Sequence, residues 1–185
     1  MVHLHVHSHY SLLEGAAGLR QLVARAVEYG VKALALTDTE GMYGAVPFYQ
    51  AARDAGVQPL LGVQVGDAVL LARDREGYAQ LCEIVTALRH GQFAALAEWP
   101  FAFGDEHLFV ISGDRALLRT LQVRGLAPIV AVTHYGGGPS RYHAAAMYRF
   151  AKQQGLRATA VNPVYFLDPE HYRIHRVLAA IRENT

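Results

Sequence analysis

Short apolar runs alternate with amphipathic stretches along the chain of 185 residues. The apolar runs predict strands, and the stretches with apolar residues three or four apart predict helices. The expected strands are Val2–Val6, Lys32–Thr37, Gln58–Val65, Ala68–Ala72, His107–Ile111, Pro128–Val132 and Ala158–Val161. The expected helices are Leu19–Tyr29, Ala45–Ala55, Glu76–Leu88, Ala116–Arg124, Tyr142–Gln154 and Pro169–Arg182. This alternation predicts one domain with an α/β fold and a mainly parallel sheet, either a small or distorted β/α barrel or an open doubly wound sheet.

Polar side chains recur where these expected strands end. In both kinds of α/β fold, functional groups gather where the strands run into the following loops. The strand ends carry His5 and His7, Thr37 and Asp38, residues 62–64, residues 112–114, residues 133–135 and Asn162. We therefore expect the functional site at this edge of the sheet.

Histidine occupies every second position at the start of the chain, from His3 to His9. If this segment is extended, His3, His5 and His7 share one face, and the intervening apolar residues share the other. Imidazole is the commonest protein ligand for transition metals, so the pattern is typical of a metal site. The alternative is a polar edge strand in which the histidines are incidental.

Charge and cysteine content limit the possible partners and compartment. The chain has 17 basic and 16 acidic residues, which gives no electrostatic footprint for tight nucleic-acid binding by this segment alone. The single cysteine, Cys82, is expected to pack in the interior, and it has no partner in the chain for a disulfide. A reducing cytoplasm fits this content. No apolar run reaches the length of a membrane span.

A glycine-rich stretch, Gly136–Gly138, precedes the expected helix at Tyr142. Backbone amides at a helix N-terminus can hold phosphate. The preferred interpretation is a flexible connection in which Ser140 caps the helix.

Five stretches of the sequence carry a resemblance to a known family. Residues 3–15 read HLHVHSHYSLLEG, residues 33–52 read ALALTDTEGMYGAVPFYQAA, and residues 58–65 read QPLLGVQV. Residues 70–82 read LLARDREGYAQLC, and the chain ends VLAAIRENT. Together they resemble the PHP (polymerase and histidinol phosphatase) domain at the N-terminus of bacterial C-family DNA polymerase III alpha chains, nearest to the error-prone branch.

The resemblance implies a PHP-type distorted (β/α)7-like barrel, which looks shortened here between about Gly91 and Ser140. It also implies up to three metal ions, often zinc or manganese, at the carboxyl ends of the strands. Active members hydrolyse phosphoesters with these metals. In some polymerases the domain is a proofreading nuclease, and in others its site is eroded and the domain is structural.

The resemblance also implies which metal ligands remain in this chain. His5 and His7 match the family's His-x-His motif, Glu14 matches an acidic ligand, and Asp38 matches the aspartate of Thr-Asp-His. His134 is placed loosely at a later ligand histidine, and its alternative is a polar residue next to the glycine-rich stretch. The other histidines are expected to be surface residues or non-ligands: His3, His9, His107, His143, His171 and His175.

Several family ligands are replaced. Thr39 stands at the histidine of Thr-Asp-His, and Gln64 stands at a bridging glutamate. Asp67 or Ala68 occupies the region of another histidine. Pro163 and Tyr165 replace the aspartate and histidine of a late Asn-Asp-Val-His motif. Because closely spaced cations need anionic ligands, a full trinuclear site is not expected. One divalent metal, zinc or manganese, is expected at most, at His5, His7, Glu14 and His134.

We therefore expect a partly eroded PHP domain with a structural role, and we assign no catalytic residue. Its expected partner is the remainder of a polymerase alpha chain, in cis or in trans, with DNA contacted only indirectly, no membrane contact and a cytoplasmic location. A residual or stand-alone metal phosphoesterase, either a 3′–5′ exonuclease or a pyrophosphatase, is the first alternative. An independent small protein that docks onto a polymerase or a repair factor is the second.

Overall fold

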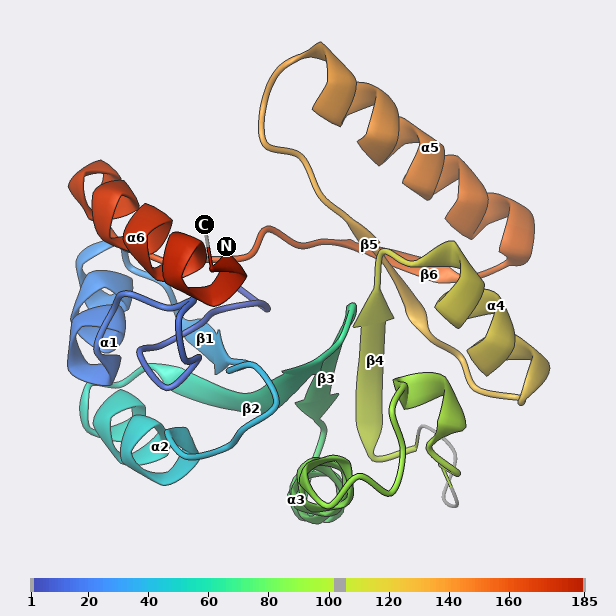
Figure 1. Cartoon of the computed structure of the whole chain (residues 1–185), viewed down its shortest axis with the longest axis horizontal. Coiled ribbons are helices and arrows are strands. Elements are labelled where there is room, and N and C mark those ends of the chain that lie inside the picture. Colours follow the sequence, from blue (N-terminus) through green and yellow to red (C-terminus); the bar gives the residue numbers. More distant parts are fainter. Residues whose placement is uncertain (1, 102–105, 185) are drawn as a thin grey trace. The chain divides into compact units, whose positions relative to one another are not determined.

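The computed structural model describes residues 2–101 and 106–184 of the chain (Figure 1). Helices and strands alternate in a mixed α/β arrangement, as the sequence predicts. The strands are β1 (Ala33–Leu36), β2 (Gln58–Val65), β3 (Ala68–Ala72), β4 (Leu108–Ser112), β5 (Ile129–Val132) and β6 (Arg157–Ala160). The α-helices are α1 (Leu19–Glu28), α2 (Ala45–Asp54), α3 (Arg75–Arg89), α4 (Arg115–Val123), α5 (Gly138–Gln154) and α6 (Tyr172–Glu183). Short 3-10 turns, η1 (Leu96–Glu98) and η2 (Pro169–His171), complete the described elements.

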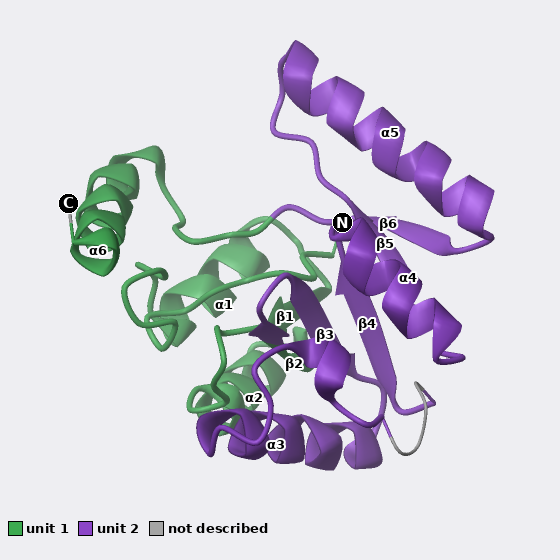
Figure 2. Ribbon diagram, turned by 45° about the vertical axis from the view of Figure 1, so that its right-hand side comes forward, with its two compact units in different colours: residues 1–63, 163–185 green, residues 64–162 purple. Residues whose placement is uncertain are grey.

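The chain divides into two compact units, coloured separately in Figure 2. The first unit comprises residues 1–63 and 163–185, and the second comprises residues 64–162. The expectation of a single domain over residues 1–185 stays a prediction.

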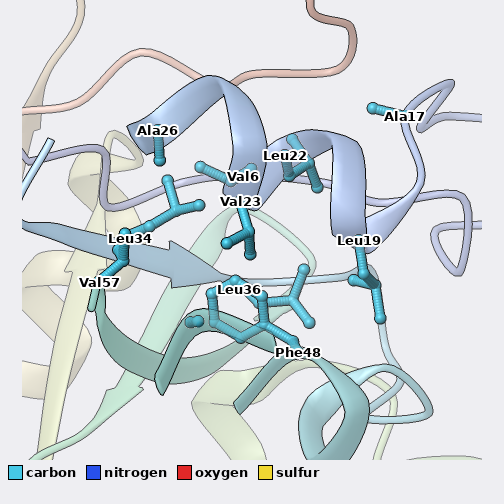
Figure 3. Close-up of a cluster of buried hydrophobic side chains, with 11 residues drawn as sticks. Val6, Ala17, Leu19, Leu22, Val23, Ala26, Leu34, Leu36, Phe48 and Val57 are labelled. Atoms are coloured by element: carbon cyan, nitrogen blue, oxygen red, sulfur yellow. The ribbon is translucent and has the colours of Figure 1, made fainter. Parts of the chain in front are cut away.

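In the first unit, β1 pairs in parallel with β2, with Ala33 opposite Gln58 and Leu36 opposite Leu61. Helix α1 has its apolar residues on one stripe, which faces a buried cluster that α2 and β1 complete (Figure 3). The members of this cluster are Val6, Ala17, Leu19, Leu22, Val23, Ala26, Leu34, Leu36, Phe48, Ala52 and Val57. Burial of this apolar surface is the main force that holds the loops after β1 in place.

The expected strand Val2–Val6 is wrong as a continuous strand. The segment forms only isolated parallel bridges, His3 with Leu34 and Val6 with Val164. Each neighbour supplies only one bridge, too few for a ladder. Even so, the segment is held on both sides, because Ala35 N–H donates to the His3 carbonyl and Val164 N–H donates to the His5 carbonyl.

In the second unit, β3 pairs antiparallel with β4, and β4 and β5 each pair in parallel with the next strand. The sheet is thus mainly parallel, as expected: β3 is the exception, because β2 turns tightly into β3 without a crossover helix. Helices α4 and α5 pack on a core of Leu118, Val130, Met147, Phe150 and Ala151. Asp74 and Asp114 cap α3 and α4, each accepting a hydrogen bond from a main-chain N–H of the first turn.

Two smaller expectations in the second unit are also corrected. Helix α5 begins at Gly138 with Gly137 as its N-cap, so Ser140 lies in the first turn and accepts a hydrogen bond from Tyr135 N–H. Pro139 suits this early start, because proline is favoured in the first turn of a helix. Cys82 is only partly buried, since it lies at the margin of the apolar face of α3.

None of the helices that the structure describes combines the length and apolar composition needed to cross a membrane.

Candidate metal centre

His5 and His7 point their rings at one another, with 2.9 Å between their Nε2 atoms. His7 is fully buried, and its Nδ1 lies 2.9 Å from the Ser11 hydroxyl. The main chain fixes both residues, because His7 N–H donates to the Val164 carbonyl and the His5 carbonyl accepts from Val164 N–H. The expectation of a shared face is therefore confirmed for this pair. The two facing Nε2 atoms are of the type that binds a transition-metal ion, and the Ser11 hydroxyl orients the His7 ring.

His3 departs from the expected pattern. Its side chain lines a small apolar cavity together with Val6 and Leu34, rather than joining the other two histidines. The single bridge to β1 and the absence of a full strand explain why the alternation breaks at this residue.

Asp38 lies just after β1, and its carboxylate is occupied by the loop of residues 8–11. It accepts hydrogen bonds from the Ser8 N–H at 2.7 Å, the Ser8 hydroxyl at 2.8 Å and the Ser11 hydroxyl at 2.6 Å. Burial raises the pKa of Asp38 above its usual range, and these hydrogen bonds oppose that shift. The carboxylate therefore ties the histidine-bearing loop to the end of β1.

Glu14 is held by two donors. Its Oε1 accepts a hydrogen bond from Arg182 Nη1 at 2.8 Å, and its Oε2 accepts one from the Thr39 hydroxyl. Its Oε2 also lies 3.8 Å from His7 Nδ1. Leu13, which precedes it, has a left-handed backbone with φ of 62°. Glu14 thus lies on the Nδ1 side of His7 with both of its oxygens engaged, and its role as a metal ligand stays a prediction.

Tyr165, which the resemblance places at the position of a family histidine, packs against His7. The two rings are stacked, with centroids 4.6 Å apart and 15° between their planes. His175 also stacks on Tyr165, with 5.0 Å between the ring centroids. Its Nδ1 lies 2.9 Å from the Glu14 carbonyl oxygen.

The surface location expected for His175 is therefore wrong, because contacts with two distant segments partly bury it. Sequence reasoning missed both His175 and Arg182. No local motif marks either residue, since both reach the site only through tertiary packing of α6.

His134 lies in the second unit, where its side chain is exposed and its main chain is fixed. The His134 N–H donates to the Asn162 side-chain oxygen, and the His134 carbonyl accepts from the Asn162 side-chain nitrogen, both at 3.1 Å. Gln64 also belongs to this unit, and its side chain donates to the Gly66 carbonyl. The role of His134 as a ligand stays a prediction.

Within residues 2–101 and 106–184, one group of three ligand-type side chains brings its ligand atoms within 4.8 Å of one another. It consists of Asp74 and Glu76 at the start of α3 and His107 directly before β4. His107 Nδ1 lies 2.8 Å from an Asp74 carboxylate oxygen, which raises the pKa of His107 and lowers that of Asp74. The expectation that His107 is a plain surface residue therefore omits this pairing, which the sequence did not reveal because the two lie 33 positions apart.

The donor set in the first unit offers one facing histidine pair, and the expectation that a full trinuclear site is absent stays a prediction. His5 and His7 can face one ion, but Glu14 and Asp38 are satisfied by protein donors. Among the residues that the structure describes, these four do not assemble into a group of the kind found at α3.

The model of the PHP domain matches residues 3–127. The alpha subunit of DNA polymerase III from Escherichia coli K12 is 32% identical over 219 residues, covering 98% of this chain and 18% of the relative. The Bacillus subtilis alpha subunit is 28% identical over 209 residues, covering 98% of this chain and 19% of the relative. An error-prone DNA polymerase from Symbiobacterium thermophilum is 45% identical over 96 residues, covering 49% of this chain and 9% of the relative.

The chain thus spans about a fifth of the length of the full alpha subunits it matches. Two solved structures share the fold at low identity. A candidate metal-dependent phosphoesterase from Bifidobacterium adolescentis has a TM-score of 0.60 and 13% identity, over 96% of each chain. An amidohydrolase from Chromobacterium violaceum has a TM-score of 0.59 and 15% identity, over 96% of each chain. The expected PHP-type α/β fold is confirmed.

Proposed function

The chain belongs to the PHP domain family, and from this premise we propose that it serves as the N-terminal PHP domain of a DNA polymerase III alpha-type polymerase in replication or repair. Its role there is structural: a folded support for the polymerase body. The partner is the remainder of the alpha chain, in cis or in trans. DNA is contacted only indirectly, and the location is the cytoplasm.

One observation carries the structural role most directly. Both retained carboxylates are used to hold the protein together, Asp38 by Ser8 and Ser11, and Glu14 by Arg182 and Thr39. A multi-metal phosphoesterase needs such carboxylates to offset the charge of adjacent cations. Carboxylates that already pair with protein donors support a scaffold over a hydrolase.

A single divalent metal, zinc or manganese, is the cofactor that the donor set can still accept. His5 and His7 would hold it, with Glu14 nearby. A metal bound there would supply charge neutralisation and a rigid link between the loop and the strand ends.

The first experiment is elemental analysis of the metal-stripped protein after reloading with zinc or manganese. We expect no more than one equivalent, lost in the His5→Ala/His7→Ala variant. Parallel assays on a small phosphodiester and on a mismatched primer end should show no hydrolysis that depends on these histidines. Two or three tightly bound equivalents, together with such hydrolysis, would refute the structural role.

A second candidate is a residual metal phosphoesterase acting on a 3′ end or on pyrophosphate. The facing Nε2 atoms of His5 and His7 favour it, because a polymerase scaffold does not require them. The same assays decide between the two. Hydrolysis that disappears in the double histidine variant would favour the enzyme.

A further inference from the structure

We propose that Arg182 is a built-in counter-cation for Glu14, so that docking of the C-terminal end of α6 and use of Glu14 as a metal ligand exclude one another. The inference deepens the proposed function and rests on its eroded metal site. In this proposal the position of α6 (red in Figure 1) decides whether the Glu14 carboxylate is available to a metal ion bound by His5 and His7.

The Glu14 carboxylate requires a partner. Its side chain is only 16% exposed, and a poorly solvated carboxylate is costly unless it is paired and hydrogen-bonded. Arg182 Nη1 supplies the charge at 2.8 Å from Oε1, and the Thr39 hydroxyl satisfies Oε2. The Arg182 guanidinium therefore already supplies the positive charge that a metal ion would otherwise bring to Glu14.

Helix α6 is fixed to this loop at further points. His175 Nδ1 lies 2.9 Å from the Glu14 carbonyl, and the His175 ring stacks on Tyr165, which stacks on His7. Arg182 lies seven residues after His175, two helical turns along the same face. The helix thus reaches both the main chain and the side chain of Glu14, all within the first unit.

A metal ion that recruited Glu14 would have to displace Arg182 or share its carboxylate. Sharing places a divalent cation and a guanidinium near the same oxygens, which is electrostatically unfavourable. Two ligands that compete for one group are negatively coupled, and the coupling is reciprocal. A metal that uses Glu14 should therefore loosen α6, and loss of Arg182 should strengthen metal binding.

Removal of the Arg182 charge should change the affinity for metal more than the free energy of unfolding. Arg182 is 43% exposed, and exposed ion pairs contribute little to folding. Removal of its charge should leave the fold intact while freeing Glu14.

The test is calorimetric titration of the metal-stripped 185-residue chain with Zn²⁺. We expect Arg182→Gln to bind Zn²⁺ about tenfold more tightly than the parent. Arg173→Gln, the same charge change on the same helix away from Glu14, should bind like the parent. Arg182→Lys, which keeps the cation, should stay close to the parent. In a Glu14→Gln background, Arg182→Gln should have no effect.

Unchanged affinity in Arg182→Gln, or an equal gain in Arg173→Gln, would overturn the proposal. A gain that persists without Glu14 would do the same. A second measurement does not depend on the variants: hydrogen exchange of α6 should accelerate when the parent is saturated with Zn²⁺, and unchanged exchange would contradict the proposal.

These outcomes are separate from a failure of the proposed function. Two or three tight zinc sites in the parent that are lost in His5→Ala/His7→Ala and kept in His107→Ala would refute the eroded site itself. A single weak site that ignores Arg182 would refute only the role of α6.

Discussion

Tyr165 lies flat against His7, with 4.6 Å between ring centroids and 15° between the ring planes. The phenol ring occupies a position at which the PHP family resemblance places a metal-binding histidine. A ring that stacks on a ligand histidine covers it without supplying a new ligand atom toward an ion. In this chain the residue at that position therefore contacts His7 by ring packing.

Truncation of this ring should destabilise the chain and uncover His7. Tyr165→Ala removes stacked contacts with both His7 and His175, each worth roughly 1 kcal/mol, so unfolding free energy should fall by about 2 kcal/mol. Urea unfolding measures this loss, and carbethoxylation of His7, followed by mass spectrometry, should become faster. Tyr148→Ala, at a tyrosine that is 52% exposed, is the control and should leave His7 as protected as in the parent. An unchanged rate in Tyr165→Ala would contradict the covering role.

Ser11 should be one of the most sensitive polar positions in the first unit. Its buried hydroxyl donates to Asp38, accepts from Thr39 N–H and lies 2.9 Å from His7 Nδ1. Ser11→Ala removes one hydrogen-bond partner from each of these buried or partly buried groups, although Asp38 keeps its two bonds from Ser8, and should lower the free energy of unfolding by about 1–3 kcal/mol in urea unfolding. Thr120→Ala removes an exposed hydroxyl bond within a helix and should change it by less than about 0.5 kcal/mol. Equal effects of the two variants would show that the Ser11 network does not stabilise the loop.

Gly15 should not tolerate a side chain. A Cβ atom there would lie 2.0 Å from the Ser8 carbonyl oxygen, so the loop that carries the histidines and Glu14 would have to move. Gly15→Ala should cost about 1–3 kcal/mol, read as a lower melting temperature. Gly113→Ala is the matched control, because no atom lies within 4 Å of its Cβ position. A melting temperature for Gly15→Ala equal to that of the control would mean that the close approach does not exist in solution.

The His107–Asp74 pair should make stability depend on pH. Asp74 raises the pKa of His107. The stabilisation that the protonated His107 gives to the folded state is therefore fully present below the usual histidine pKa of 6.5, and it is lost as pH rises through the raised pKa. The pKa of Asp74 is lowered by His107, so that contribution is present above 3.8 and is lost as pH falls through the lowered value.

His107→Gln should therefore lower the free energy of unfolding more at about pH 5.5 than at about pH 9. Urea midpoints at the two pH values measure it. His143→Gln, at an exposed histidine of α5, should show no comparable difference. A His107→Gln loss that is independent of pH would assign the effect to packing.

Several features followed from the sequence because they depend on neighbouring residues. The order of helices and strands from Leu19 onward is confirmed within a few residues, since apolar periodicity is a local property. The facing of His5 and His7 is also local, because residues two apart share a face in extended backbone. The PHP family was likewise identified from short motifs, the most specific of which lie in the first third of the chain.

The surroundings of those histidines were decided by tertiary structure. Arg182 meets the Glu14 side chain across 168 positions, and His175 meets the Glu14 main chain across 161. Neither contact leaves a local pattern, because α6 has ordinary amphipathic periodicity whichever segment it packs against. The sequence thus determined that a histidine pair with nearby carboxylates exists, and only the packing of distant segments decided that protein donors occupy those carboxylates.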